Sequence, residues 1–202
     1  QTLARRLQAL DRTLTEIEVR FLKLRKRYGD EDVGLFSLFL LNLVRLERGE
    51  ALYTEAGVPH AYLGGDIVEC MANSDNVVRA GLTPKYKDVE TLVEILKPLT
   101  EAPLVEGRRQ DGETVYRTPA SEFLVSRRTL DAGETWRAPS SDGPELYLIT
   151  RGEVDATWGA ADGMLHLPRG ASCFVPAAVP RLEMGGRVES ELFRVRMPNP
   201  ED

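Results

Sequence analysis

Residues 48–63 read RGEALYTEAGVPHAYL, and residues 169–184 read RGASCFVPAAVPRLEM. The two stretches align without a gap and share a glycine turn, a short strand, a small-residue turn and a proline. Because one hairpin pattern recurs at a fixed offset, the repeat predicts two related β-barrel units. The identical positions are Arg48 with Arg169, Gly49 with Gly170, Ala56 with Ala177, Val58 with Val179 and Pro59 with Pro180.

The second copy lies in a region rich in strand and turn signals. Beyond Pro119 the chain has short apolar segments separated by turn pairs such as Asp142-Gly143 and Gly185-Gly186. Such spacing is typical of an antiparallel sandwich or barrel and disfavours a parallel βαβ sheet. Strands are predicted near residues 123–125, 146–150, 154–158, 164–167, 172–175 and 192–195.

The start of the sequence carries a helical apolar pattern. Apolar residues recur at alternating spacings of three and four, which predicts one helix that ends at Gly29. A coiled-coil dimer and a helix packed in a bundle both fit this stripe, and we favour the bundle. The stripe consists of Leu3, Leu7, Leu10, Leu14, Ile17, Phe21, Leu24 and Tyr28.

Further elements are predicted between the helix and the second barrel. Asp32 is expected to cap a short apolar helix, and Asp88 a helix over residues 89–96. Alternation from Leu43 towards Gly49 predicts the first strand. We therefore expect a mainly β protein with an α-helical segment. Its predicted parts are residues 1–42, the end of a helical domain; 43–100, part of a first barrel; 101–118, a linker; and 119–202, a second barrel.

Composition limits the partners and the compartment. Lys and Arg number 26 against 32 Asp and Glu, a net charge of −6, so we expect no nucleic-acid partner. The apolar run from Val33 to Val44 is too short to cross a bilayer, so no membrane partner is expected. Cys70 and Cys173 lie far apart without a paired motif, which favours a reducing, cytoplasmic environment.

A long motif follows the first copy of the repeat. Residues 59–85 read PHAYLGGDIVECMANSDNVVRAGLTPK, which resembles type I mannose-6-phosphate isomerases, with similarity over roughly Asp32 to Leu96. The resemblance implies cupin, jelly-roll-like barrels: one partial catalytic barrel and one complete C-terminal barrel without a metal site. It also implies interconversion of mannose 6-phosphate and fructose 6-phosphate, by metal-assisted proton transfer through an enediol.

The resemblance assigns zinc as cofactor and His60 as one of its ligands. The aligned position in the second copy is Arg181, which stays protonated and offers no lone pair to a metal. The family's other ligands are a second histidine, a glutamine and a glutamate, and nothing in residues 1–47 resembles them. We therefore expect them from polypeptide upstream of this chain, and take the other histidine, His166, as structural.

Four further residues are candidates for contacts with a phosphorylated hexose. The resemblance places Arg79 in the active site, and Asp75 as a carboxylate near the substrate, both in catalytic roles. Tyr62 and Lys85 are candidate substrate-binding residues. Simpler alternatives stay open: a surface ion pair for Arg79, a turn residue for Asp75, a core aromatic for Tyr62 and an exposed lysine for Lys85.

Two functions remain open from the sequence. The chain is expected to be a fragment of an isomerase that needs its N-terminal half, because it opens inside what resembles the helical domain. A separate chain carrying the missing half, or a degenerate gene product, stays an alternative. The second function is a non-catalytic cupin binding or regulatory module that has lost the metal site.

Overall fold

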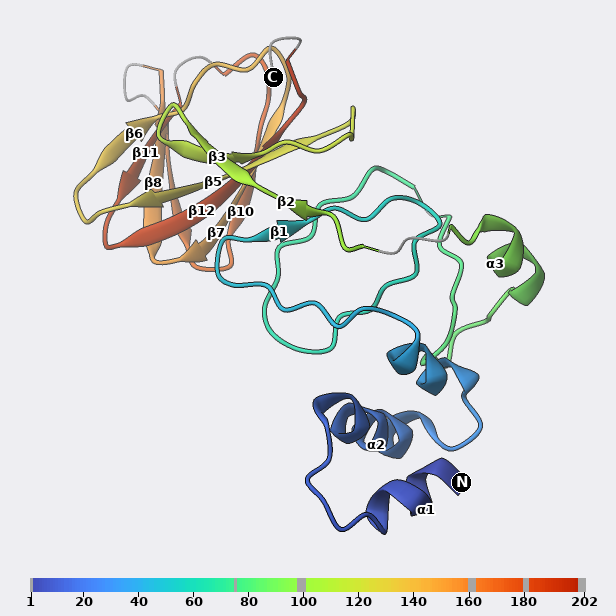
Figure 1. Cartoon of the computed structure of the whole chain (residues 1–202). Helices are drawn as coiled ribbons and strands as arrows, with labels where there is room; N and C mark the ends of the chain where they lie inside the picture. The colour runs from blue at the N-terminus through green and yellow to red at the C-terminus, as the bar shows by residue number, and fades with distance from the viewer. Residues whose placement is uncertain (1, 75, 98–100, 160–162, 180–181, 200–202) are drawn as a thin grey trace. The chain divides into compact units, whose positions relative to one another are not determined.

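A computed structural model describes residues 2–74, 76–97, 101–159, 163–179 and 182–199 (Figure 1). The chain divides into two compact units. The first holds the described residues of Gln1–Arg45, Thr54–Gly64 and Ser74–Pro103. The second holds those of Leu46–Tyr53, Gly65–Asn73 and Leu104–Asp202. Asp75 and Arg181, both named from the sequence, lie outside the described residues.

The first unit is built on short helices. They are α1 (Thr2–Gln8), α2 (Glu16–Tyr28), the 3₁₀ helix η1 (Val33–Phe39) and α3 (Val89–Ile95). Apolar residues of the predicted stripe, Leu7 and Phe21 among them, are buried together with Leu35 of η1. Most of the stripe, with Leu3, Leu14 and Leu24, therefore packs within the chain, whereas Leu10 is exposed. No described helix has the length and apolar character needed to cross a membrane.

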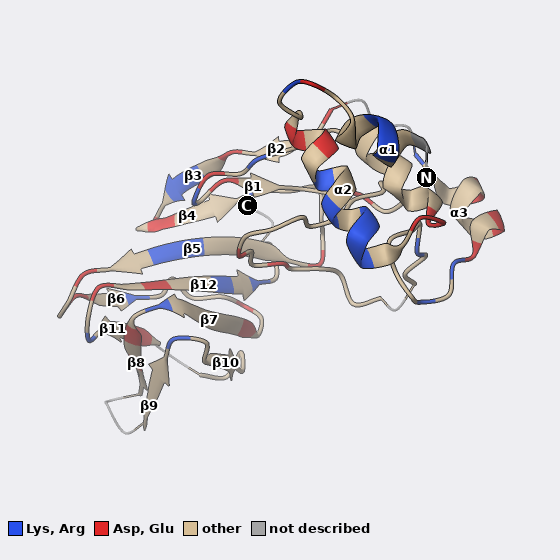
Figure 2. Ribbon diagram, turned by 90° about the horizontal axis from the view of Figure 1, so that it is seen from below, with Lys and Arg blue, Asp and Glu red and all other residues tan. Residues whose placement is uncertain are grey.

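The prediction of one continuous N-terminal helix was wrong. The helix breaks between α1 and α2, because Thr15 caps α2: the Glu18 backbone N–H donates to its hydroxyl, and the Glu18 carboxylate accepts from the Thr15 N–H. This reciprocal capping box satisfies two amides and favours a new helix start. Gly29 ends α2 at φ 90°, as predicted. The ribbon in Figure 2 is coloured for acidic residues at the start of α2 and for basic residues at its end, which suits the helix dipole.

The two predicted caps at aspartates are confirmed, but the predicted first strand is not. Asp32 caps η1, and Asp88 caps α3. The stretch from Leu43 to Gly49 is irregular, and strand β1 is only Ala51–Leu52, paired with β2 (Leu104–Val105). Alternating side chains alone do not make a strand, because the backbone groups also need a neighbouring strand.

The predicted linker over residues 101–118 is also wrong. It contains β2, β3 (Gly107–Gln110) and β4 (Glu113–Tyr116), and β3 and β4 extend the main sheet of the second unit. The charges of β3 hid this hairpin, because all four of its residues are exposed at a sheet edge. Asp111 and Gly112 form the turn, both with positive φ.

The second unit is the antiparallel two-sheet sandwich that the sequence predicts. One sheet has the order β10-β7-β12-β5-β4-β3, and the other β6-β11-β8-β9. Gly185 and Gly186, expected in a turn, lie in β11. The remaining strands are β5 (Leu124–Leu130), β6 (Thr135–Arg137), β7 (Glu145–Arg151), β8 (Glu153–Trp158), β9 (Gly163–Pro168), β10 (Ser172–Val175), β11 (Glu183–Gly186) and β12 (Ser190–Arg196).

The sequence repeat is also a repeat of backbone geometry. Gly49 and Gly170 both have positive φ, 91° and 84°. At the repeat offset, β1 corresponds to the first two residues of β10. The same turn bonds recur on both sides of the strand. Before the strand, the amide of Glu50 donates to the carbonyl of Glu47 (3.0 Å), and in the second copy Ala171 donates to Pro168 (2.9 Å). After the strand, Val58 donates to Glu55 (3.2 Å), and in the second copy Val179 donates to Pro176 (3.0 Å).

A buried ion cluster lies inside the second unit beside its apolar core. Arg194 of β12 is only 1% exposed, and its guanidinium contacts the carboxylates of Glu113 (3.1 Å) and Glu145. Ser126 donates to Glu113, and Tyr147 to Glu145. Burial raises the pKa of the Tyr147 hydroxyl, which keeps it a neutral donor. The cluster thereby joins β4, β5, β7 and β12.

Replacing Glu145 by alanine should destabilise the fold strongly. The change removes one carboxylate from a buried arginine, and breaking such a pair costs about 3–5 kcal/mol. Urea unfolding of the wild type and the Glu145→Ala variant measures this difference. The control is Glu183→Ala, which removes the partner of the mainly exposed Arg137 and should change stability by about 1 kcal/mol or less. Equal effects at the two sites would contradict a structural role for the cluster.

Candidate active site

His60 follows a tight turn whose shape depends on a glycine. Gly57 has φ 85°, and a β-carbon there would lie 2.4 Å from the carbonyl oxygen of Ile95. The Lys97 amide donates to the Gly57 carbonyl over 3.0 Å. The turn that presents His60 is therefore fixed against the chain that leaves α3.

The ring of His60 is oriented as a metal ligand requires. Its Nδ1 lies 2.9 Å from the carbonyl oxygen of Val58. A carbonyl oxygen only accepts, so Nδ1 carries the proton and the neutral ring keeps its lone pair on Nε2. The side chain is exposed, so Nε2 is accessible. Histidine ligands characteristically donate their other ring N–H to such an acceptor.

Tyr62 lies beside this histidine. The two ring centroids are 5.8 Å apart, at an interplanar angle of 58°. Tyr62 is 61% exposed, so the reading of this residue as a core aromatic was wrong. Its role as a substrate-binding residue stays a prediction.

The segment that carries Arg79 is held by Asp32, the cap of η1. The Asp32 carboxylate accepts from the Gly34 amide (2.8 Å) and the Leu82 amide (3.0 Å), and Lys87 lies 3.5 Å away. Gly34 and Gly81 meet backbone to backbone, so a β-carbon on Gly81 would lie 2.8 Å from the Gly34 Cα. One aspartate thus caps a helix and anchors the chain three residues after Arg79, at Leu82.

Arg79 and Lys85 differ in exposure. Arg79 is half-buried, so its guanidinium is partly shielded from water. Lys85 is exposed, and its backbone amide bonds the Thr83 hydroxyl over 3.2 Å. Their roles as catalytic and substrate-binding residues stay predictions, and so does the role of Asp75.

The described residues include one candidate zinc ligand, His60, and not a complete set of ligands. No group of three or more histidine, cysteine, aspartate or glutamate side chains in the described ranges could hold a metal ion. Zinc sites need three or four protein ligands. The role of His60 as a zinc ligand stays a prediction, and a zinc ion at His60 would need further ligands from outside the described residues.

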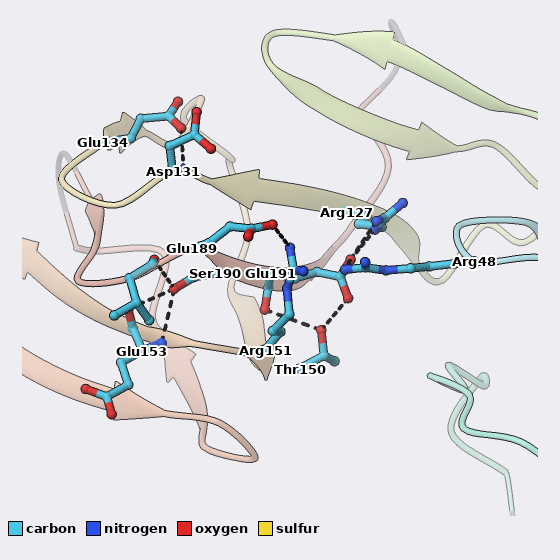
Figure 3. Close-up of polar contacts among 11 residues, drawn as sticks. Arg48, Arg127, Asp131, Glu134, Thr150, Arg151, Glu153, Glu189, Ser190 and Glu191 are labelled. Atoms are coloured by element: carbon cyan, nitrogen blue, oxygen red, sulfur yellow. Dashed lines mark hydrogen bonds and ion pairs between the residues drawn. The ribbon is translucent and has the colours of Figure 1, made fainter.

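A polar network that sequence reasoning missed lies just before this site in the chain. Glu191 of β12 is buried and accepts from Arg48 (2.8 Å), Arg127 (2.7 Å) and Thr150 (2.9 Å), as Figure 3 shows. Arg48 begins the repeat that leads to His60. Its identity with Arg169 was visible in the sequence, but its partner sits 143 residues away. No local pattern reveals such a pair.

Gly49 completes the attachment of this segment to the sheet. The Tyr116 hydroxyl donates to the Gly49 carbonyl over 2.7 Å. A β-carbon on Gly49 would lie 2.4 Å from Nη1 of Arg127. Glycine is therefore needed at this position both for its positive φ and for the close approach of the arginine. The network fixes residues 46–53 on the outer face of the six-stranded sheet.

Acid should loosen this attachment. Burial acts to raise the pKa of Glu191, but hydrogen bonds from Thr150, Arg127 and Arg48 outweigh it and lower the pKa. A lowered folded-state pKa gives stability that is present above the unfolded value, about 4.3, and is lost as pH falls through the folded value. Urea midpoints between pH 7 and pH 3 should therefore fall more steeply for the wild type than for Glu191→Gln. Parallel profiles would show that this carboxylate does not contribute.

The sequence is similar to mannose-6-phosphate isomerases. No family model matches the chain. It is 42% identical over 183 residues to mannose-6-phosphate isomerase 2 of Arabidopsis thaliana, covering 86% of this chain and 39% of that protein. With the rat mannose-6-phosphate isomerase it shares 40% over 163 residues, covering 77% and 38%. The chain thus spans about two fifths of the length of these relatives.

Solved structures give the same result. Phosphomannose isomerase from Salmonella typhimurium bound to fructose 6-phosphate and zinc matches with a TM-score of 0.65 and 26% identity, over 98% of this chain and 54% of that one. Its K132A mutant matches with a TM-score of 0.66 and 26% identity, over 96% and 55%. The resemblance expected from residues 59–85 and the predicted mainly β fold are confirmed.

Proposed function

We infer that the chain belongs to the mannose-6-phosphate isomerases and carries part of their active site. The proposed activity is the interconversion of mannose 6-phosphate and fructose 6-phosphate. The observation that carries this proposal is His60, which stands in the matching motif with its Nε2 lone pair accessible and its Nδ1–H bonded to Val58. Residues 43–100 then form the C-terminal part of a catalytic barrel, and the sandwich a second barrel without a metal site.

The chemistry needs few groups. An aldose becomes a ketose when a proton leaves the carbon beside the carbonyl and a proton is delivered to the carbonyl carbon, so no oxidant is consumed. Zinc, held by His60 and by ligands from outside the described residues, would supply Lewis acidity for the enediol pathway. Arg79 is proposed to stabilise negative charge, and Asp75 to carry a proton or orient a hydroxyl.

In this proposal two exposed side chains, Tyr62 and Lys85, bind the substrate. The Tyr62 hydroxyl can contact the sugar or its phosphate beside His60, and Lys85 adds a cation for the phosphate. The two cysteines are free, which supports a cytoplasmic location. The proposed partner is polypeptide equivalent to the remaining length of the relatives, which supplies the other ligands.

The alternative function is a non-catalytic cupin module. The observation that favours it is the incomplete ligand set of the described residues. The two functions differ in one respect that can be measured: only the isomerase proposal requires this chain to support catalysis when the remaining polypeptide is present.

Exchanging a segment of a relative for this chain distinguishes the isomerase from the non-catalytic module. The matching part of Arabidopsis mannose-6-phosphate isomerase 2 is replaced by this chain, and zinc content and isomerase activity are measured. The exchanged protein should bind one zinc ion per chain and be active, whereas His60→Ala should lose both. The control His166→Ala alters an exposed histidine that bonds Asp155 on the four-stranded sheet, and should keep both. A folded exchanged protein with neither zinc nor activity would favour the non-catalytic module.

Arg79 is tested in the same exchanged protein. Arg79→Ala should lower kcat by about 10²–10³, the usual effect of removing one group that stabilises charge in a transition state. Its unfolding midpoint should stay near that of the unsubstituted protein. Arg137→Ala, which removes an exposed arginine paired with Glu183, serves as the matched control. Unchanged kcat in the Arg79 variant would remove this residue from the site.

A further inference from the structure

The segment 76–88 carries Arg79 and Lys85, the two cations predicted to act on a phosphorylated hexose. It belongs to the first unit and forms neither a helix nor a strand. Because it lacks the backbone bonds of a helix or a sheet, the place of its side chains depends on contacts with other parts of the chain. The contacts that fix this segment therefore decide where its two cations stand.

Asp32, in the same unit, makes such contacts. Its Oδ1 accepts from the Gly34 amide (2.8 Å) and caps η1, whereas its Oδ2 accepts from the Leu82 amide (3.0 Å). Nζ of Lys87 lies 3.5 Å from the same Oδ2. The side chain of Asp32 is only 9% exposed, so water competes little for these bonds. One nearly buried carboxylate thus joins η1 to the chain three residues after Arg79.

The backbone at Leu82 is strained. Its φ is 54°, in the left-handed region that residues other than glycine rarely adopt. The Leu82 side chain packs against the helical core of the first unit. Gly81 comes so close to Gly34 that a β-carbon on Gly81 would lie 2.8 Å from the Gly34 Cα. A strained conformation persists only where several contacts determine it, so the bond to Asp32 helps to hold this one.

We propose that Asp32 is a positioning residue for Arg79. By fixing the backbone at Leu82, it holds the half-buried guanidinium where negative charge develops on the substrate. Asp32 acts through the backbone and does not exchange a proton with the substrate. This inference rests on the proposed function, because it uses the role of Arg79 given there. A misplacement of about 1 Å can cost about 10²-fold in rate, so a carboxylate away from the chemistry can control it.

The two roles of Asp32, as helix cap and as anchor of Leu82, use different oxygen atoms. Asparagine caps a helix about as well as aspartate but has one acceptor oxygen, because its amide nitrogen only donates. Asp32→Asn should therefore keep the bond to the Gly34 amide and lose the bond to the Leu82 amide. Gly81→Ala disturbs the same anchor from the other side, because its added β-carbon would meet Gly34.

A double-mutant cycle in the segment-exchanged protein tests this role. Asp32→Asn and Gly81→Ala should each lower kcat about tenfold or more. In the Arg79→Ala background each should lower kcat further by less than about twofold, because no guanidinium is left to position. The matched control is Asp88→Asn, which alters the aspartate that caps α3 through the Thr91 amide (3.1 Å). It should change kcat by less than about twofold, because asparagine also caps helices.

Two kinetic outcomes would overturn the proposal. Equal fold-losses of kcat with and without Arg79 would mean that Asp32 supports the fold in general and does not act through the guanidinium. Unchanged kcat in both Asp32→Asn and Gly81→Ala would mean that the position of Arg79 does not depend on this anchor.

Hydrogen exchange in the 202-residue chain tests the anchor independently of catalysis. The Leu82 amide should exchange at least about tenfold faster in Asp32→Asn than in the wild type, and the Gly34 amide should change by less than about threefold. If asparagine keeps the Leu82 bond and gives up the Gly34 bond, Gly81→Ala alone decides the cycle. Rapid exchange of the Leu82 amide in the wild type would contradict the anchor itself. A confirmed anchor beside a folded exchanged protein without zinc or activity would refute the proposed function and leave the anchor in place.

Discussion

The buried pairing of Arg194 with Glu113 and Glu145 constrains the rest of the second unit. A guanidinium at 1% exposure is tolerated only when its charge is paired, so the strands that carry its carboxylate partners must keep their register. Hydrogen bonds to Glu145 and the nearby carboxylates outweigh burial and raise the pKa of Arg194, which keeps it charged. The interior of the second unit thereby combines a buried ion cluster with an apolar core.

A second carboxylate, Glu191, works on the opposite face of the same strand β12. It holds Arg48 and Arg127, and with Tyr116 it attaches the start of the repeat to the outer sheet face. Because side chains alternate along a strand, β12 contributes to both groups of contacts. Arg194 faces inward to the buried ion cluster, and Glu191 faces outward to Arg48 and Arg127. The second unit thus holds Arg48 and Gly49 on the outer face of its six-stranded sheet.

Much of the fold was predictable because its signals are local. The strand alternation around Leu146–Thr150, the cap at Asp88 and the glycine that ends α2 depend on neighbours in the chain. Failures came where the deciding interaction was elsewhere. The stretch from Leu43 lacked a strand to pair with, and the exposed, charged residues of β3 hid a hairpin whose second strand, β4, pairs with β5.

For the site, the sequence by itself determined the motif of residues 59–85, the repeat, and therefore the family likeness and the choice of His60, because these are properties of residue order. Only the tertiary structure decided that His60 presents Nε2, that Tyr62 is exposed beside it, and that Asp32 fixes the segment after Arg79. The anchoring of Arg48 by Glu191 was also decided there. The physical reason is distance: orientation and partner choice depend on groups that the folded chain brings together from positions up to 143 residues apart.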